Sequence, residues 1–312
     1  MKGKIRNFER DNLAYMIDVT IVTCKKYLHN KEGNSYIHTI FLEYTLLKDA
    51  LESKGISVKR THWDNPDYDW SQTKAVVIRT VWDYFERFDE FNTWMIQAAS
   101  VTNLINPLPL QQWNSHKFYL QQLQEKGVRI VPTEFVAKGF KTSLEEISVK
   151  RGWTHLVIKP AISAAAFHTY KVSAENRAAK EIVFQELLVS RDMLVQPFIE
   201  TIVDKGEASL MVMNGTYTHA ILKKAKQGDF RVQDDYGGTV HLYNPSKEEI
   251  EFAEYINTQC PVLPIYGRVD IVWDAAGKPM LSEIEFLDPE LWIRNAPTTA
   301  EILAEGIAKA IC

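Results

Sequence analysis

The feature that most constrains the fold is a regular alternation of apolar runs and amphipathic segments over residues 18–107. The runs typical of buried strands are "DVTIVTC" (18–24), "AVVIRT" (75–80) and "VTNLINP" (101–107). The segments between them, 35–55 and 83–100, carry apolar residues at helical spacing. This βαβ rhythm predicts an α/β fold with an open parallel sheet.

Ligands of such sheets bind beyond the carboxyl ends of the strands. The candidate substrate-binding residues at these ends are Thr23, Arg79, Trp82, Asp83 and Tyr84. Arg79 could clamp a carboxylate with two hydrogen bonds. Trp82 and Tyr84 could equally pack against the following helix, and Arg294, after "DPELWI", could face the same pocket or the surface.

The second half of the chain changes character. Residues 114–127 are expected to form one helix, opened by Asn114 or Ser115 and closed by Gly127. Residues 207–224 predict a hairpin with an Asn-Gly turn at 214–215. Capping boxes are expected at Ser246/Glu249 and Thr298/Glu301, where the last two helices begin.

The stretch "YGRVDIVWDAAGKPMLSEIEF" (266–286) places charges on two strand-like runs joined by a turn. Residues two apart in a strand share a face, so Arg268 joins Asp270 and Glu283 joins Glu285. Three carboxylates against one arginine leave a surplus of negative charge, which Mg²⁺ would neutralise. A solvent-exposed sheet face with a surface salt bridge is an equally good reading of these residues alone.

Several further residues suggest anion binding. Lys159 ends the apolar run "THLVIK", Lys117 lies near the start of the predicted helix, and Lys223 ends the hairpin. Each one alone is more often a surface lysine. The segment "QPF" could offer backbone groups to a base or be a plain edge strand, and the loop 226–238 could be a solvated linker. Neither a GxxxxGK nor a GxGxxG motif occurs in the sequence.

Composition excludes several function classes. The formal charge of −4 argues against non-specific nucleic-acid binding, and no run of about 18 apolar residues predicts a membrane span. Residues 1–17 are expected to be a flexible leader rather than a secretory signal. Cys24, Cys260 and Cys312 lack metal-ligand spacing, so a reducing cytoplasm is the expected setting.

The order of these motifs resembles that of the ATP-grasp enzymes. In that family an R-x-D strand precedes an E-x-N or E-x-E strand, matched here by "GRVD" and "SEIEF". The resemblance implies that Asp270, Glu283 and Glu285 hold Mg²⁺, or Mn²⁺ in its place, as two ions bound with ATP. Glu285 departs from the usual asparagine. The alanines of "AISAAAFHTY", after Lys159, replace a Gly/Ser-rich phosphate loop.

The resemblance also implies the other roles. Arg268, Arg231 and Lys159 would be catalytic. The residues implied to bind ATP are Lys117, Lys159, Ser163, Gln196, Pro197, Phe198, Ile199, Glu207 and Lys223. The motifs "RTVWDYFERFDEF", "NPLPLQQWNSHKFYL" and "SEIEFLDPELW" are similar to the group that contains the cyclo-ligase of cycloserine biosynthesis, and to glutathione-synthetase-like and RimK-like enzymes.

By this resemblance, the chain has an N-terminal pre-ATP-grasp substrate domain (18–112) and two α+β subdomains (113–195 and 196–312) that clasp ATP. The implied reaction activates the carboxylate of a small molecule or amino acid as an acyl phosphate, which an amine attacks to form an amide or a ring. ADP and phosphate would be released, with loop 225–240 as a lid. The alternative functions are a kinase and a nucleotide-binding module without turnover. The chain could also form a homodimer.

Overall fold

The computed structural model describes residues 16–164, 166–226 and 237–312. The chain divides into two compact units, Met1–Leu108 with Ala300–Cys312, and Pro109–Thr299. Residues 300–312, which we expected in the last subdomain, therefore belong to the unit of the N-terminal sheet. All but the last two residues of the predicted leader, Arg231 and most of the predicted lid lie outside the described residues.

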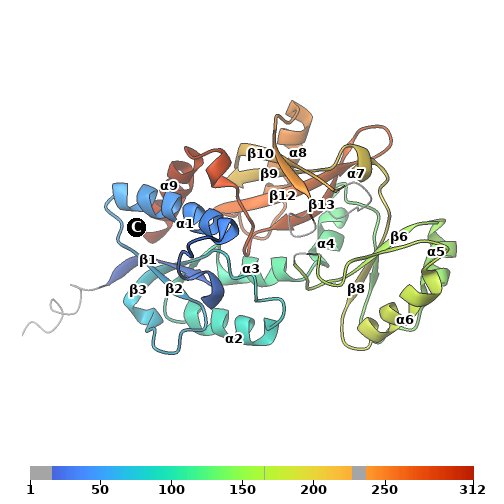
Figure 1. The fold of residues 1–312 in the computed structure, drawn as a ribbon, viewed down its shortest axis with the longest axis horizontal. Helices are drawn as coiled ribbons and strands as arrows, with labels where there is room; N and C mark the ends of the chain where they lie inside the picture. The colour runs from blue at the N-terminus through green and yellow to red at the C-terminus, as the bar shows by residue number, and fades with distance from the viewer. Residues whose placement is uncertain (1–15, 165, 227–236) are drawn as a thin grey trace, which may run out of the picture. The chain divides into compact units, whose positions relative to one another are not determined.

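The first unit is built on an all-parallel sheet, which confirms the predicted α/β architecture (Figure 1). The strands run β2–β1–β3–β4 across it, with bounds Ile17–Thr23 (β1), Val58–His62 (β2), Thr73–Ile78 (β3) and Asn103–Ile105 (β4). Strand β2 was not predicted. Its sequence, "VKRTH", is mostly polar, and only Thr61 within it is buried, which is expected of an edge strand.

Among its described residues, the first unit also contains the α-helices α1 (Ser35–Ser53), α2 (Phe88–Ala99) and all but the first residue of α9 (Thr299–Ile311). Asn34 caps α1 by accepting a hydrogen bond from the backbone N–H of Ile37. The predicted start of α2 at residue 83 was wrong by five residues. Successive turns occupy that segment, in which the N–H groups of Asp83 and Tyr84 donate to the C=O of Val81.

The second unit contains two antiparallel sheets. The smaller has the order β5–β8–β6–β7 and a core of its own beneath helices α5 (Leu144–Arg151) and α6 (Arg177–Leu188). Its strands are Glu134–Val136 (β5), Leu156–Pro160 (β6), Tyr170–Val172 (β7) and Met193–Pro197 (β8).

The larger sheet has the order β11–β10–β9–β12–β13. Its strands are Glu207–Met213 (β9), Thr216–Lys224 (β10), Thr239–Tyr243 (β11), Tyr266–Trp273 (β12) and Pro279–Glu285 (β13). The predicted Asn-Gly turn joins β9 to β10, and both Asn214 (φ 54°) and Gly215 (φ 81°) adopt the left-handed conformation that a type I′ turn requires. The helix α7 (Thr201–Asp204) lies between β8 and β9 in the chain, and α8 (Lys247–Thr258) connects β11 to β12. The predicted capping box of Ser246 and Glu249 opens α8.

The two faces of the larger sheet differ in chemistry. Alternate residues of β9 and β12, such as Leu210 and Val269, pack into an apolar core with residues of α4 (Tyr119–Glu125) and α8. The residues between them, Glu207, Ser209, Arg268 and Asp270, therefore point to the opposite face. This alternation concentrates the charged side chains on one surface.

The helix predicted over residues 114–127 is two helices, α3 (Leu108–Ser115) and α4. The helical ladder breaks at Lys117, because its backbone N–H donates to the C=O of Ala161 at 2.8 Å. Asn114 and Ser115 therefore end α3 rather than open a helix. Lys117 lies in the link between the two helices.

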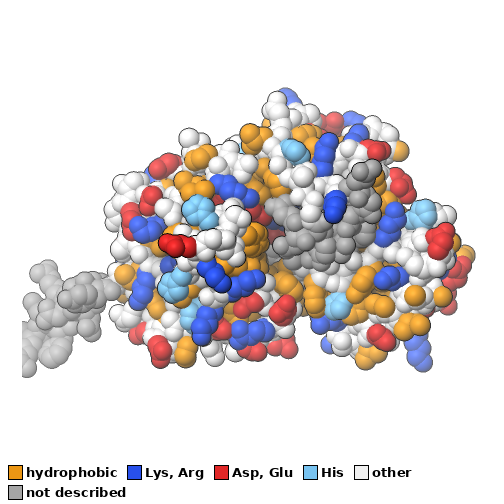
Figure 2. Space-filling model, in the orientation of Figure 1, with side chains coloured by type: hydrophobic (Ala, Val, Ile, Leu, Met, Phe, Trp, Pro, Cys, Tyr) orange, Lys and Arg blue, Asp and Glu red, His pale blue; other side chains and the backbone are white. Residues whose placement is uncertain are grey.

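No helix in the described part of the chain is long and apolar enough to cross a membrane. On the face drawn in Figure 2, Lys and Arg side chains are interspersed with Asp and Glu side chains. This mixed surface agrees with the small formal charge of the whole sequence.

Candidate active site

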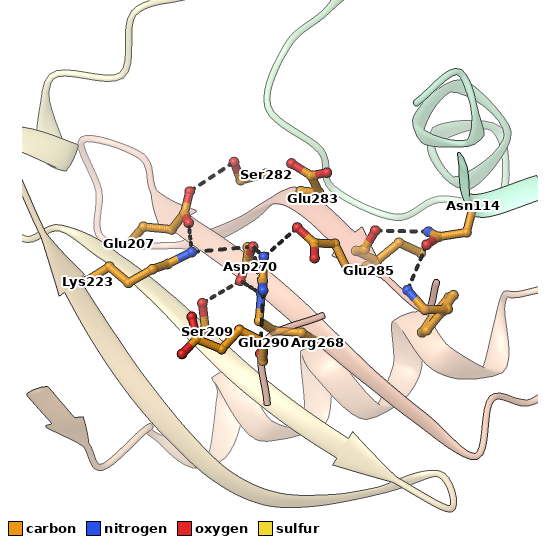
Figure 3. Close-up of polar contacts among 12 residues, drawn as sticks. Asn114, Glu207, Ser209, Lys223, Arg268, Asp270, Ser282, Glu283, Glu285 and Glu290 are labelled. Atoms are coloured by element: carbon orange, nitrogen blue, oxygen red, sulfur yellow. Dashed lines mark hydrogen bonds and ion pairs between the residues drawn. The ribbon is translucent and has the colours of Figure 1, made fainter. Parts of the chain in front are cut away.

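The predicted charged hairpin is formed by β12 and β13. Arg268 pairs with Glu285 and Asp270 pairs with Glu283, after which a bulge leaves Ser282 as an extra residue on β13. The bulge changes the phase of β13, so that Glu283 and Glu285 share a face with the two charged residues of β12. Figure 3 shows these four side chains converging over the sheet.

Arg268 is held mainly by two of these carboxylates. Its Nε and Nη2 atoms donate to both oxygens of Asp270 at 2.9–3.1 Å, and Nη2 also donates to Glu285 Oε1 at 2.5 Å. Burial by itself raises the pKa of Asp270, but Arg268 and Lys223 outweigh it and hold the pKa at about 2. Burial, together with the charges of Glu283 and Asp270, raises the pKa of Glu285 to about 7 in spite of Arg268.

A second buried ion pair lies one strand further across the sheet. Lys223 on β10 contacts Glu207 on β9, and its Nζ lies 3.5 Å from Asp270 Oδ2. Ser209 donates a hydrogen bond to Asp270, and Ser282 donates one to Glu207 at 3.3 Å. The two ion pairs are therefore joined into one network through Asp270 (Figure 3).

Two lysines from outside the larger sheet complete the network. Lys117 Nζ lies 2.9 Å from Glu283 Oε1 and donates to the C=O of Ser163 at 2.5 Å. Lys159, at the end of β6, interacts electrostatically with Glu283, Glu207 and Asp270. Burial lowers the pKa of Lys159, and the nearby positive charge of Lys117 lowers it further against the pull of Glu283.

The charges of this network balance. From the sequence we counted three carboxylates against one arginine, which was incomplete because Lys117 and Lys223 lie within ion-pair distance of two of these carboxylates. The full set has four acids and four bases: Glu207, Asp270, Glu283, Glu285, Lys117, Lys159, Lys223 and Arg268. The site is therefore electrostatically satisfied by the protein alone.

The oxygen donors nevertheless suit a divalent ion. Glu283 and Glu285 each use one carboxylate oxygen, and the second oxygen of each has no partner among residues 16–164, 166–226 and 237–312. Carboxylate oxygens are the ligands that Mg²⁺ prefers. Asp270 is fully engaged by Arg268 and Ser209, and within the described chain no three Asp, Glu, His or Cys side chains are gathered as a metal site. Glu283 and Glu285 thus fit the role better than Asp270.

Asn114 and Tyr119 fix the strand that carries the two glutamates. Asn114 Nδ2 and the Tyr119 hydroxyl both donate to the C=O of Ile284, at 2.9 Å each. In return, Tyr119 accepts from the N–H of Ile284 at 3.0 Å and Asn114 accepts from the N–H of Phe286 at 2.7 Å. These bonds satisfy the free edge of β13 and tie it to the segment that carries Lys117.

The predicted adenine-binding segment lies where β8 ends. Gln196 and Pro197 pair with β6, the N–H of Phe198 donates to the C=O of His155, and the Gln196 side chain donates to Thr133. Ile199 follows the strand and packs on the apolar cluster of Val131, Val272 and Met280. The segment is therefore well ordered and has an apolar wall beside it.

The loop after Lys159 contains two residues whose backbone conformation is typical of glycine. Ala166 (φ 56°) and His168 (φ 51°) adopt the left-handed conformation that glycine tolerates best. Ser163 is buried, its hydroxyl donates to the C=O of Pro160, and its own C=O accepts from Lys117. The alanines in the sequence thus did not prevent a tightly turned backbone here.

The predicted substrate residues of the first unit lie at the ends of β1 and β3. Thr23 is buried and hydrogen-bonds Thr80, whose φ of 62° is unusual for a β-branched residue. Trp82 stacks edge-on with Tyr27, and Tyr84 packs against Phe91 of α2. Tyr84 therefore packs on the following helix, as the packing alternative expected, whereas Trp82 has ring contacts with residues that precede it in the sequence.

Of the remaining polar candidates, Asp83 and Arg294 have partners within their own units. Arg79 is buried, and Asp83 accepts a hydrogen bond from Trp63 Nε1 and lies 3.7 Å from Arg87. Burial raises the pKa of Asp83. In the second unit, Arg294 forms an ion pair with Glu290 at 2.8 Å.

Sequence reasoning missed four residues of the site: Ser209, Ser282, Tyr119 and Trp292, whose ring centre lies 5.4 Å from the central carbon of the Arg268 guanidinium. A signal was available for Ser209, which follows Glu207 by two residues in an otherwise apolar strand. Tyr119 and Trp292 have no local signal, because their partners lie far away in the sequence.

Two family models match the chain. The model "D-cycloserine synthetase DcsG, N-terminal domain" matches residues 19–106, and "Prokaryotic glutathione synthetase, ATP-grasp domain" matches residues 117–288. Cycloserine biosynthesis protein DcsG of Streptomyces lavendulae is 28% identical over 286 residues, covering 85% of this chain and 92% of the relative.

Solved structures show the same fold. A crystal structure of D-cycloserine synthetase DcsG covers 94% of this chain and 99% of its own, with a TM-score of 0.84 and 26% identity. The D-alanine–D-alanine ligase of Bacillus anthracis matches with a TM-score of 0.64 and 14% identity, covering 95% and 97% of the two chains.

Proposed function

This chain belongs to the ATP-grasp family, with a glutathione-synthetase type of ATP-grasp domain, and from that premise we propose that it is an ATP- and Mg²⁺-dependent ligase that forms C–N bonds. The observation that carries the proposal is the pair of carboxylate oxygens, one on Glu283 and one on Glu285, that have no partner in the described part of the chain and lie beside two lysines. Oxygen donors for Mg²⁺ next to cations for phosphate are what a MgATP site needs.

Three of the four basic residues are assigned a role in the reaction. Lys117 and Lys159 bind phosphate oxygens, and Lys117 can leave Glu283 for a phosphate because the Glu283 side chain is partly exposed to solvent. Arg268, locked by Asp270, stabilises the oxyanion that forms when an amine attacks the acyl phosphate. Bound Mg²⁺, held by Glu283 and Glu285, would neutralise charge on the transferring phosphoryl group. The four negative charges of ATP and the four positive charges of two such ions would sum to about zero, so the balance of four acids and four bases would be preserved.

The substrate is proposed to be a small amino-acid-derived carboxylate, with ADP and phosphate as the other products. The similarity to a cycloserine biosynthesis protein makes O-ureido-D-serine the first compound to test, with ring closure as the outcome. Within the first unit, Arg79 and Asp83 are the proposed substrate contacts, because a guanidinium suits a carboxylate and a carboxylate suits an ammonium group.

The test is phosphate release from ATP and Mg²⁺ with O-ureido-D-serine, amino acids and short peptides, with product masses read in parallel. Substrate-dependent phosphate release with a new C–N bond supports the proposal. A substrate that gains one phosphoryl group, without phosphate release, would instead indicate a kinase. Bound ATP with no turnover across the pool would favour a nucleotide-binding module.

The metal assignment needs its own variant. Glu283→Ala is expected to abolish Mg²⁺-dependent ATP binding, and Glu248→Ala is the matched control because Glu248 lies exposed on α8 and pairs only with Lys278. If Glu283→Ala binds ATP with an unchanged Mg²⁺ requirement, the assignment is wrong.

A further inference from the structure

We propose that Trp292 is a positioning residue that fixes the plane of the Arg268 guanidinium, an inference that rests on the proposed function for its catalytic consequence. The central carbon of the guanidinium lies 5.4 Å from the centre of the Trp292 ring. Asp270 and Glu285 hold the edges of the same group. Both side chains are buried, Trp292 to 3% and Arg268 to 8% exposure.

Trp292 occupies its place at a local cost. Its backbone is left-handed, with φ 45° and ψ 39°, a conformation that bulky residues rarely adopt. Its Nε1 is buried and has no hydrogen-bond partner among the residues that the structure describes. Such features persist where the surrounding structure enforces them, and they cluster at functional sites. Here the enforced feature is the ring face that Trp292 presents to Arg268.

The segment around Trp292 is anchored on the rung of the sheet that carries Arg268. His219 and Arg268 both pair with Met211, from opposite sides. The His219 ring nitrogen Nε2 lies 2.7 Å from the C=O of Leu291, and Arg268 Nη1 donates weakly to the C=O of Glu290 at 3.5 Å. Residues 290–292 therefore form a strap across that rung, and the left-handed turn at Trp292 directs the indole onto the guanidinium.

The indole supplies something that the carboxylates do not. Asp270 and Glu285 attract the guanidinium in its own plane, whereas the electron-rich face of an indole attracts it from above. Together they leave one orientation for Arg268. Removing the ring should let the guanidinium tilt out of that plane about its hydrogen bonds to Asp270, while the ion pairs and the fold persist.

A measurement without turnover tests the geometry directly. In ¹⁵N-labelled protein, the Nε–H resonance of Arg268, identified by its absence in Arg268→Lys, should be shifted by the ring current and protected from exchange. Trp292→Phe keeps a ring face and should retain both properties, whereas Trp292→Leu should lose both. A resonance that is unchanged in Trp292→Leu would overturn the proposal whether or not the protein is a ligase.

Kinetics test the consequence. Trp292→Leu should lower kcat on the order of tenfold, with the KM for ATP and the thermal midpoint close to those of the unmodified protein, and Trp292→Phe should recover most of the rate. Trp94→Leu is the control, since Trp94 is buried in α2 with an equally unpartnered Nε1. A purely structural role would be shown if Trp292→Leu lowered kcat, ATP affinity and melting temperature together, or if Trp292→Phe were as slow as Trp292→Leu. If the unmodified protein lacks turnover, the proposed function fails while the resonance test still decides the geometry.

Discussion

Replacing Tyr119 by phenylalanine removes one hydroxyl, and with it the hydrogen bonds of Tyr119 to the backbone of Ile284, which lies between the two glutamates of β13. The N–H of Ile284 loses the acceptor that lies at 3.0 Å, whereas the C=O of Ile284 keeps its bond from Asn114. Both residues are almost fully buried. A buried donor left unpaired costs about 1–3 kcal/mol. For a unit of this size, a loss of about 2 kcal/mol lowers the melting temperature by about 4–8 °C.

The assay is thermal unfolding followed by circular dichroism, with Tyr255→Phe as the matched control. The Tyr255 hydroxyl donates to the C=O of Lys126 at 3.3 Å in an exposed position, so its loss should stay within about 0.5 kcal/mol. Asn114→Ala adds the second arm of a cycle. The double variant removes both donors to the C=O of Ile284, and it should lose about 1 kcal/mol more than the sum of the single variants.

Equal melting temperatures for Tyr119→Phe and Tyr255→Phe would refute this reasoning, because they would mean that the Ile284 N–H does not depend on the hydroxyl. Strict additivity in the double variant would refute the shared acceptor. Because Ile284 lies between Glu283 and Glu285, the stabilised strand should also matter for metal binding. Tyr119→Phe should therefore need more Mg²⁺ for half-maximal activity.

Three other substitutions test separate parts of the site. Gly267→Ala would place a Cβ 2.4 Å from the Phe286 ring, so it should lower the free energy of unfolding by about 1–3 kcal/mol. Adding Phe286→Leu should restore part of that stability. An unchanged melting temperature in Gly267→Ala would mean that the ring moves freely. Lys223→Met leaves the buried acid Glu207 without its ion-pair partner, at a cost of about 3–5 kcal/mol that adding Glu207→Gln should reduce. An unaltered melting curve would contradict the ion pair. The pKa of Glu285 is raised from 4.5 to about 7, so its protonation stabilises the folded protein fully below about pH 4.5, and this contribution is lost as the pH rises through about 7. The apparent affinity for Mg²⁺ should rise over the same range, because the carboxylate becomes charged. Glu285→Asn should flatten the pH dependence of both the melting temperature and the Mg²⁺ affinity, and slopes equal to those of the unmodified protein would disprove the assignment.

Patterns of local origin could be predicted from the sequence. The strands β1 and β3 are long apolar runs, and the Asn-Gly turn and the capping box of Ser246 each depend on two or three neighbouring residues. The pairing of β12 with β13 followed from the turn between them. The spacing of Glu283 and Glu285 then placed both carboxylates on one face.

Features that depend on distant partners could not be predicted. The break at Lys117 arises because Ala161, far along the chain, competes for its N–H. The charge balance of the site needs Lys117 and Lys223, which the local pattern at residues 266–286 does not contain. The left-handed backbone at Trp292 likewise could not be predicted, because the residue there is not a glycine or an asparagine, which are the usual signals of that conformation.

The membership of α9 in the first unit makes Pro109–Thr299 an insertion within that unit. Three side chains of α9, Leu303, Ala304 and Ile307, are fully buried. During synthesis, residues 109–299 leave the ribosome before these side chains do, so the inserted unit can fold first. The parallel sheet, although it is translated earliest, must wait with an incomplete core until α9 arrives, which makes it the part most in need of protection from aggregation in the cell.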